Sequence, residues 1–510
     1  MSIARKILEN TFVQVLGKLL TAALSIVVLK IISGYLGTSG YGDYTTVYQF
    51  LAFFGIIADF GIYTITVREM SRDESRIPMI LGNIMGLRTF LAVVAMGLAV
   101  LTVFLVPTYN NTLIPLGVLI ATLATFFTLL NGTVSSVLQV YLKMHYATVS
   151  LVVGKIVSVV YMGWVAYIAF TGDLINGFYH LLWAGVLGNL VMFLITAYYV
   201  RRFCKITYQF DLAYWKKVFF TSLPFGVALI LNTIYFRLDV ILMTFILPHS
   251  QSIGGEMVCA SALCSDTEIG LYGVAMRMLE MLVIIPVYFM NSVLPVMTRY
   301  IEEQSEKIRS LMQYSFDFLV ATGLPILVGS FILARPIIHF ISDPQFLSGS
   351  LFTFGSDIAV RILMFAMLFS FVNALFGFTL VVLNKQVRLM FINAGAVLFN
   401  LIGNILVIPV WGFRGAAITS TLSEAIILIF TYWMAQKFLG FHLSLRTFIR
   451  TLAAALVMGA VVWIGFEWMA EMWFIWQLAV LIPLGGLVYL LLMFKTKAIT
   501  PEMMSLLRKK

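Results

Sequence analysis

Charged side chains are scarce in this sequence. Of its 510 residues, 11 % are Asp, Glu, Lys or Arg, 61 % belong to the hydrophobic set AVILMFWYC, and the mean hydropathy is +0.99. A soluble globular domain carries roughly 25 % charged residues. The scarcity of charge therefore excludes a soluble enzyme, a disordered chain and a nucleic-acid-binding module. We predict an integral membrane protein of the all-α class.

Cysteine and histidine are also few. Three Cys residues cannot build a disulfide framework, and a bond between Cys259 and Cys264, which share one polar loop, stays open. The five His residues are scattered and form no pattern typical of a metal site. No GxxxxGK[ST] sequence occurs, which argues against ATP hydrolysis by this chain. We predict a protein that is not an enzyme and binds neither metal nor cofactor.

Long apolar runs are abundant instead. About 20 apolar residues are needed for a helix to cross the hydrocarbon core, and helices satisfy their own backbone groups there. The runs are continuous rather than alternating, which favours helices over a barrel. We predict fourteen transmembrane helices: Phe12–Ile32, Tyr44–Val67, Ile80–Leu105, Leu113–Tyr141, Thr148–Phe170, Phe178–Val200, Val218–Leu247, Ile269–Val296, Tyr314–Phe340, Ile358–Leu383, Phe391–Trp411, Ala416–Ala435, Thr451–Phe466 and Phe474–Phe494.

The basic residues predict the orientation of these helices. Most of the 33 Lys and Arg residues fall in alternate loops, beginning with Arg5 and Lys6 and ending with Lys509 and Lys510. Cytoplasmic loops carry such an excess of positive charge. We therefore expect a multi-pass protein of the cell membrane, the inner membrane where there are two, with both termini in the cytoplasm. The longest predicted exterior loop, Pro248–Glu268, is too short for a catalytic domain.

A weak internal echo predicts two halves. Gly40-Tyr-Gly-Asp-Tyr44 opens the second predicted span and Ile269-Gly-Leu-Tyr-Gly273 opens the eighth, each after an exterior loop. Transporters often consist of repeated halves with the substrate site at their interface. We expect two pseudo-symmetric six-helix lobes and a terminal helix pair. Their predicted boundaries are 1–202, 203–440 and 441–510, and the last segment includes a cytoplasmic tail.

Several charges lie deep inside the predicted spans. A charge at mid-bilayer costs about 2.5–3.5 kcal/mol on insertion scales, so it needs a partner or a hydrated cavity. Arg277 and Glu280 are three residues apart and can pair on one helix face. The surplus is positive and predicts a cationic, hydrated cavity between two halves that holds an anionic passenger. The predicted substrate-binding residues are Lys18, Arg88, Lys155, Arg237 and Arg277, and the predicted coupling or gating residues are Asp59, Asp239 and Glu280.

Short motifs along the chain resemble those of the Wzx-like oligosaccharide flippases, within the multidrug/oligosaccharidyl-lipid/polysaccharide exporter (MOP) superfamily. The matching segments are Tyr35-Leu-Gly37, Gly40-Tyr-Gly42, Asp59-Phe-Gly61, Arg68-Glu69, Gly270-Leu-Tyr272 and Gly412-Phe-Arg-Gly-Ala-Ala417. The resemblance implies movement of a polyisoprenyl-pyrophosphate-linked glycan from the cytoplasmic to the outer leaflet, for O-antigen, capsule or exopolysaccharide synthesis. It also implies alternating access, contact with the lipid bilayer, and no nucleic-acid partner.

Four alternatives or details stay open at this point. A cation-coupled multidrug antiporter of the same superfamily would use twelve helices and a site dominated by carboxylates. A lipid II flippase would differ only in its passenger. A membrane-embedded glycan polymerase or ligase would need a larger exterior loop, although such machinery is an open partner. The coupling ion, H⁺ or Na⁺, is not determined by these patterns.

Overall fold

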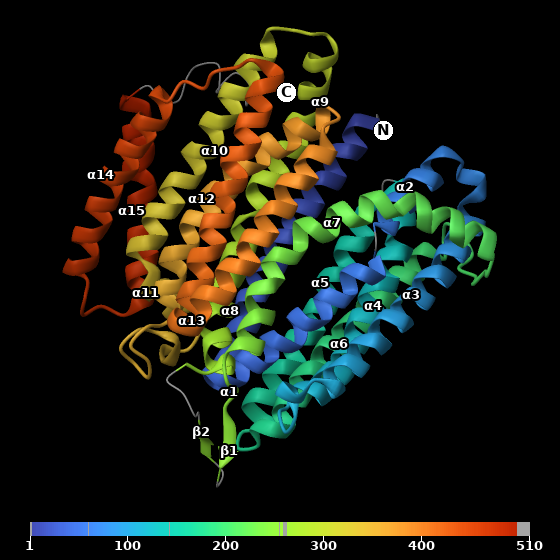
Figure 1. The fold of residues 1–510 in the computed structure, drawn as a ribbon, viewed down its shortest axis with the longest axis horizontal. Helices are drawn as coiled ribbons and strands as arrows, with labels where there is room; N and C mark the ends of the chain where they lie inside the picture. Colours follow the sequence, from blue (N-terminus) through green and yellow to red (C-terminus); the bar gives the residue numbers. More distant parts are fainter. Residues whose placement is uncertain (1–2, 60, 142, 254–255, 259–262, 497–510) are drawn as a thin grey trace. The chain divides into compact units, whose positions relative to one another are not determined.

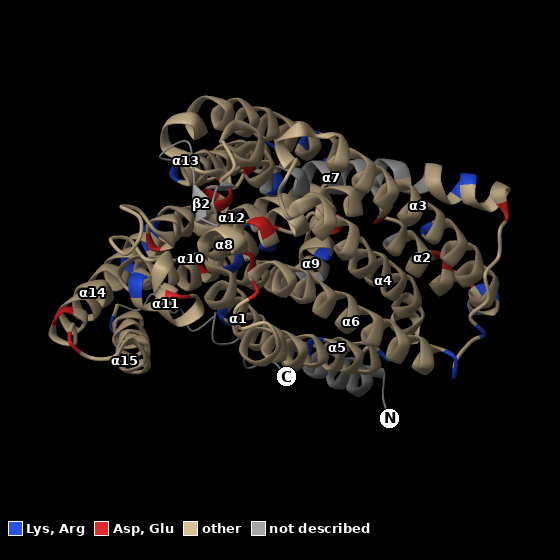
Figure 2. Ribbon diagram, turned by 90° about the horizontal axis from the view of Figure 1, so that it is seen from below, with Lys and Arg blue, Asp and Glu red and all other residues tan. Residues whose placement is uncertain are grey.

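The computed structural model describes residues 3–59, 61–141, 143–253, 256–258 and 263–496, and its architecture is almost entirely helical (Figure 1). The backbone divides into two compact units, Met1–Gly270 and Leu271–Lys510. Lys, Arg, Asp and Glu are sparse along the helices, as Figure 2 shows. The predicted all-α membrane class is confirmed.

The first unit contains seven helices, a small hairpin and the start of an eighth helix within the described residues. Its helices are α1 (Ile3–Asp59), α2 (Ile62–Arg72), α3 (Ile77–Leu105), α4 (Ile114–Val140), α5 (Met144–Trp164), α6 (Leu174–Val200), α7 (Leu212–Ile246) and the first turns of α8 (Ser265–Leu282). The hairpin pairs β1 (Gln251–Ile253) with β2 (Glu256–Val258) in antiparallel register. Short turns of other helix types are η1 (Glu74–Arg76), η2 (Pro107–Tyr109) and η3 (Val165–Ala169).

The second unit holds the remainder of α8 and seven further helices among its described residues. They are α9 (Ile284–Glu302), α10 (Lys307–Ile332), α11 (Ala334–Ile341), α12 (Ser356–Val382), α13 (Gln386–Leu439), α14 (Arg446–Trp468) and α15 (Phe474–Lys495), with the short turn η4 (Pro344–Phe346) before α12. Helix α12 packs against α9, α10 and α13. Helix α14 packs against α10 and α15, so the chain's last two helices join this unit through α10.

Twelve helices among the described residues are long and apolar enough to cross a membrane. The first of these candidates, Leu20–Ile56, covers parts of the first and second predicted spans, and α7 is not among the twelve. The structure therefore supports a polytopic membrane protein with twelve candidate spans. The finer count of fourteen is not confirmed.

Two glycines break the longest helices. Gly37 in α1 has φ 68° and ψ −170°, and Gly412 in α13 has φ 54° and ψ −134°. Such angles suit glycine because a Cβ atom would clash with the backbone. Each glycine turns the chain within one residue and leaves helix on both sides. The segment between residues 33 and 43, predicted as a loop, is instead helical apart from the break at Gly37.

Other predicted spans are interrupted where the apolar run continues. The second predicted span crosses the end of α1 at Asp59 and the start of α2, where Gly61 has φ 71°. The eighth contains the junction between α8 and α9 at Val283, and the ninth the junction between α10 and α11 at Leu333. Hydrophobicity predicts which residues enter the membrane, but it does not mark such breaks.

Polar side chains join the two arms of α13 beside Gly412. Asn404 Nδ2 donates to Asn400 Oδ1 over 3.1 Å, and Asn400 Nδ2 lies 3.4 Å from Ser420 Oγ on the other arm. All three side chains are buried. Since a buried amide needs hydrogen-bonding partners, these contacts favour one geometry for the break.

Candidate functional site

Arg88 occupies a polar position inside the first unit. Its side chain on α3 is 3 % exposed and forms an ion pair with Asp59 of α1. Its Nη1 also donates to Thr133 Oγ1 over 3.1 Å and to the Leu129 carbonyl over 3.3 Å, both on α4. Three helices are therefore joined at one guanidinium. The charge of this predicted substrate ligand is balanced by the carboxylate of a predicted gating residue.

A glycine on α4 makes room for this guanidinium. A methyl group at Gly132 would lie 3.1 Å from Arg88 Nη1, closer than most Cβ contacts. Asp59 is 35 % exposed, whereas Arg88 is almost fully enclosed. Burying a charge requires a nearby countercharge and hydrogen-bond acceptors, and this arrangement provides both. The pair is suited to holding α1, α3 and α4 together.

Arg237 and Asp239 lie on α7 with different surroundings. Arg237 is half-buried and donates from Nη1 to Gln49 Oε1 on α1. Asp239 is fully buried. Residues two apart on a helix do not share a face, which agrees with this difference in exposure. Arg237 therefore contributes to the contact between α1 and α7 in the first unit.

Arg277 and Glu280 form the ion pair that their spacing predicts, which confirms that expectation. Arg277 Nη1 lies 3.0 Å from Glu280 Oε2 on α8, and their side chains are 41 % and 30 % exposed. Both side chains therefore keep accessible surface beyond the contact between them.

The two predicted lysines lie on neighbouring helices of the first unit. Lys18 on α1 is exposed and Lys155 on α5 is half-buried, and these helices pack against each other. The structure thus places Lys18, Lys155, Arg88 and Arg237 in one unit and Arg277 in the other. Among the described residues, no group of three His, Cys, Asp or Glu side chains has the arrangement of a metal site.

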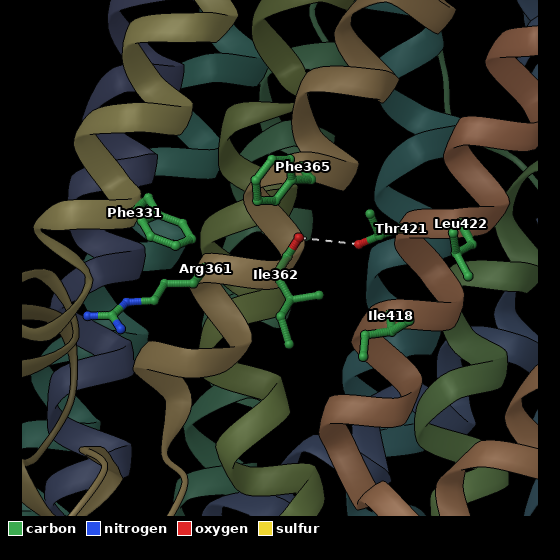
Figure 3. Close-up of a pocket in the computed structure, with 7 residues that line it drawn as sticks. All are labelled: Phe331, Arg361, Ile362, Phe365, Ile418, Thr421 and Leu422. Carbon is green, nitrogen blue, oxygen red and sulfur yellow. Dashed lines mark hydrogen bonds between the residues drawn. The ribbon is translucent and has the colours of Figure 1, made fainter. Parts of the chain in front are cut away.

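A cavity of about 200 Å³ lies in the second unit among α10, α12 and α13 (Figure 3). Its lining residues are Phe331, Arg361, Ile362, Phe365, Ile418, Thr421 and Leu422. The Thr421 hydroxyl donates to the Ile362 carbonyl over 3.3 Å, and the Arg361 guanidinium points away from the middle of the cavity. Arg361 lies over the Phe331 ring at 5.5 Å. The interior is apolar and unsuited to a phosphate.

Sequence reasoning missed a buried polar cluster in the first unit. His249 Nε2 lies 3.4 Å from Asp43 Oδ1 on α1, and His249 Nδ1 lies 3.2 Å from Ser265 Oγ at the start of α8. Asp266 accepts hydrogen bonds from the Ser39 and Ser250 hydroxyls. Predicting an exterior loop for Asp43 and Asp266 concealed their burial. A sequence feature that could have indicated this cluster is the position of Asp43 within the motif Gly40-Tyr-Gly-Asp-Tyr44.

A second missed carboxylate is buried in the other unit. Glu424 on α13 is 3 % exposed, and Asn373 on α12 donates to its Oε2 over 2.6 Å. Thr431 Oγ1 in turn lies 3.4 Å from Asn373 Oδ1. The sequence offers no basic neighbour for Glu424, so its amide partner on another helix could not be foreseen.

Cysteine chemistry differs between two loops. Cys264 is disulfide-bonded, whereas Cys259 lies outside the described residues. Cys204 is a buried free thiol between α6 and α7, and burial raises its pKa to about 11. A thiol with so high a pKa is largely protonated and unreactive at neutral pH.

These features define a class: a polytopic α-helical membrane protein whose few internal charges are mostly held in polar contacts. Its fold resembles that of lipid II flippase MurJ in an inward closed conformation, with TM-score 0.69, 14 % identity, and 95 % of this chain and 98 % of that chain covered. An inward-facing multidrug resistance transporter of the MATE family matches with TM-score 0.64 and 14 % identity, over 84 % of this chain and 98 % of that one. A MOP-superfamily transporter from Pyrococcus furiosus matches with TM-score 0.57 and 13 % identity, covering 85 % and 95 % of the two chains.

The chain belongs to the polysaccharide biosynthesis protein family, which it matches over residues 7–301, more than half of its length. A membrane protein of Methanocaldococcus jannaschii is 32 % identical over 130 residues, and this match spans about a quarter of each chain (25 % and 23 %). The family match confirms the predicted resemblance to polysaccharide biosynthesis proteins, and the fold is similar to those of the MurJ and MATE proteins. The protein is a multi-pass membrane protein of the polysaccharide biosynthesis family, with a fold like those of these transporters.

Proposed function

We propose that this protein is a transporter, specifically a lipid-linked oligosaccharide flippase. It moves a polyisoprenyl-pyrophosphate-linked glycan from the cytoplasmic to the outer leaflet, for O-antigen, capsule or exopolysaccharide synthesis. Membership of the polysaccharide biosynthesis family supports the glycan, and cationic side chains within apolar helices support the pyrophosphate. Guanidinium groups bind phosphate oxygens in bidentate geometry, and this binding strengthens where water is restricted.

One observation carries the assignment: the Arg277 guanidinium lies within an apolar helix, is 41 % exposed and pairs with Glu280 of the same helix. The pyrophosphate diester carries two negative charges, one on each phosphate, and can replace the single charge of Glu280. Arg237, Lys155 and Lys18 are proposed to contact the passenger at other stages of its passage. Arg88 is the weakest of the proposed ligands because an ion pair and two hydrogen bonds already hold the two terminal nitrogens of its guanidinium.

We further propose fourteen crossings with both termini in the cytoplasm. The two arms of α1 on either side of Gly37 account for two crossings, and α7 adds one to the twelve candidates. The disulfide-bonded Cys264 supports an exterior position for the segment after α7, since disulfides persist in oxidising compartments. The proposed lobes, 1–202 and 203–440 with a terminal pair 441–510, follow from this topology.

The experiment is substitution of Arg277 in cells that depend on this protein for a surface glycan. Arg277→Ala is expected to lower surface glycan about tenfold or more, because a hydrogen bond to a charged group contributes about 1.5–3 kcal/mol. Lipid-linked precursor should accumulate in the cytoplasmic leaflet. Arg277→Lys should retain part of the export, since it keeps the charge but loses bidentate geometry.

The matched control is Arg309→Ala. Arg309 also pairs with a glutamate three residues away, Glu306, but both side chains are largely exposed at the start of α10. Its loss should leave export unchanged. Normal export by Arg277→Ala would remove this residue from the mechanism. Accumulation of lipid II in place of a surface-glycan precursor would identify the other pyrophosphate-linked passenger.

A further inference from the structure

The first unit contains a close contact between α1 and the first turns of α8. A methyl group at Gly42 would lie 1.7 Å from the Asp266 carbonyl oxygen, and one at Gly270 would lie 2.0 Å from the Thr38 carbonyl oxygen. Only glycine allows backbones to approach this closely. The two sequence motifs that echo each other, around Gly40 and Gly270, therefore contribute to one contact.

The cluster of Asp43, His249 and Asp266 lies at this contact. Asp43 and Asp266 are 3 % and 1 % exposed, and their like charges repel each other. Asp266 is satisfied by Ser39 and Ser250, whereas Asp43 Oδ1 is buried and accepts no hydrogen bond among the described residues. His249 Nε2 lies 3.4 Å from this oxygen.

The titratable groups around His249 come from three helices. Asp43 belongs to α1, and Tyr179 of α6 interacts electrostatically with it. Asp266 and the buried Glu268 belong to the first turn of α8. Burial lowers the pKa of His249, which favours a neutral imidazole. A neutral imidazole accepts a hydrogen bond at one ring nitrogen and donates one from the other. At His249, Nε2 can accept from a protonated Asp43 carboxyl while Nδ1 donates to the Ser265 hydroxyl.

We propose that this cluster is a proton-binding site that holds α1 against α8. A proton taken from solvent lies between Asp43 Oδ1 and His249 Nε2 when the helices are in contact. Without it, two carboxylates would be buried together at a cost that separates the helices. The contact therefore forms with uptake of one proton and is lost with its release. Naming the proton as the coupling ion of transport rests on the proposed function.

The direction of the pH effect follows from proton linkage. Above about pH 6.5 the site carries no proton when the helices are separated, so forming the contact takes one up. The equilibrium constant for contact formation therefore falls by up to about tenfold for each unit that the pH rises. Below this value a separated His249 is itself protonated, so one proton is present in either state. The dependence should then level off.

The test measures how often the contact opens. The full-length protein in detergent carries Thr38→Cys in a Cys204→Ser background, and maleimide labelling is followed from pH 5.5 to 8. Thr38 is buried at the contact, so labelling reports its opening. The exposed Asn110→Cys variant in the same background corrects for the thiolate fraction at each pH. Corrected labelling should rise several-fold or more between pH 6.5 and 8 and level off below.

Two substitutions test the site itself. Asp43→Asn imitates the protonated carboxyl and should abolish the rise with pH. Asp266→Asn removes the repulsion but leaves Asp43 buried, so it should reduce the rise. Asp173→Asn, an exposed carboxylate of the same unit, should retain it. Gel filtration checks folding of each variant. A parent without pH dependence, or an Asp43→Asn protein that keeps it, would overturn the proposal. Because the assay contains no glycan lipid, its failure would leave the Arg277 experiment unaffected.

Discussion

Replacing Asp59 by Asn should destabilise the first unit while leaving its shape unchanged. The substitution removes the negative charge beside Arg88, which is 3 % exposed and has only neutral partners on α4. Removing one partner of a buried ion pair costs about 3–5 kcal/mol because the remaining charge is buried without compensation. Asp59 itself is 35 % exposed, so water offsets part of the loss. We expect a destabilisation of about 3 kcal/mol, at the lower end of that range.

The assay is unfolding of the purified protein in mixed micelles, followed by circular dichroism. A double variant, Asp59→Asn with Arg88→Met, should recover most of the stability, because an apolar side chain of similar size often replaces a buried pair without loss. Glu306→Gln, which breaks the exposed pair with Arg309, is the control and should change stability by at most about 1 kcal/mol. If Asp59→Asn unfolds like the parent, the pair does not neutralise Arg88 and our reasoning is refuted.

Two further predictions concern backbone and thiol chemistry. Gly412→Ala should lower stability by about 1–3 kcal/mol, because its φ of 54° and ψ of −134° strain any other residue, and Gly395→Ala, with open space around it, should not. The same unfolding assay measures both, and equal stability would contradict the strain. Cys204 should react with maleimide about 100-fold more slowly at pH 8 than an exposed thiol, because its pKa of about 11 leaves little thiolate. Equal rates would show that the thiol is accessible and ionised.

The sequence predicts the fold class well because apolar length and charge placement are local properties. Runs of about 20 apolar residues and alternating basic loops are sufficient to locate most membrane helices. Breaks inside helices are less visible. Gly37 and Gly412 belong to motifs that mark them, but the run around Val283 continues through the junction between α8 and α9. The signal there is a proline rather than hydropathy, because Pro286 lacks the backbone N–H that would bond to the Leu282 carbonyl.

The site is predictable only where partners are near in sequence. Arg277 and Glu280 are three residues apart, so helical geometry alone predicts their contact. Asp59 and Arg88 meet across two helices, and nothing in their spacing indicates it. Asp43, His249 and Asp266 come from three segments and reach one cluster through the glycine contact between α1 and α8. In the sequence, Asp43 and Asp266 resemble polar residues of loops, and only their burial in the fold makes them part of a proposed proton-binding site.

The central claim is that a phosphorylated lipid crosses the membrane through contact with Arg277. Its most direct test is the purified protein in liposomes that contain a fluorescent polyprenyl-pyrophosphate disaccharide, with the probe exposed in the outer leaflet quenched over time. We predict that the parent and Arg309→Ala move the probe between leaflets and that Arg277→Ala moves it about tenfold more slowly or not at all. Equal rates for Arg277→Ala and the parent would contradict the claim.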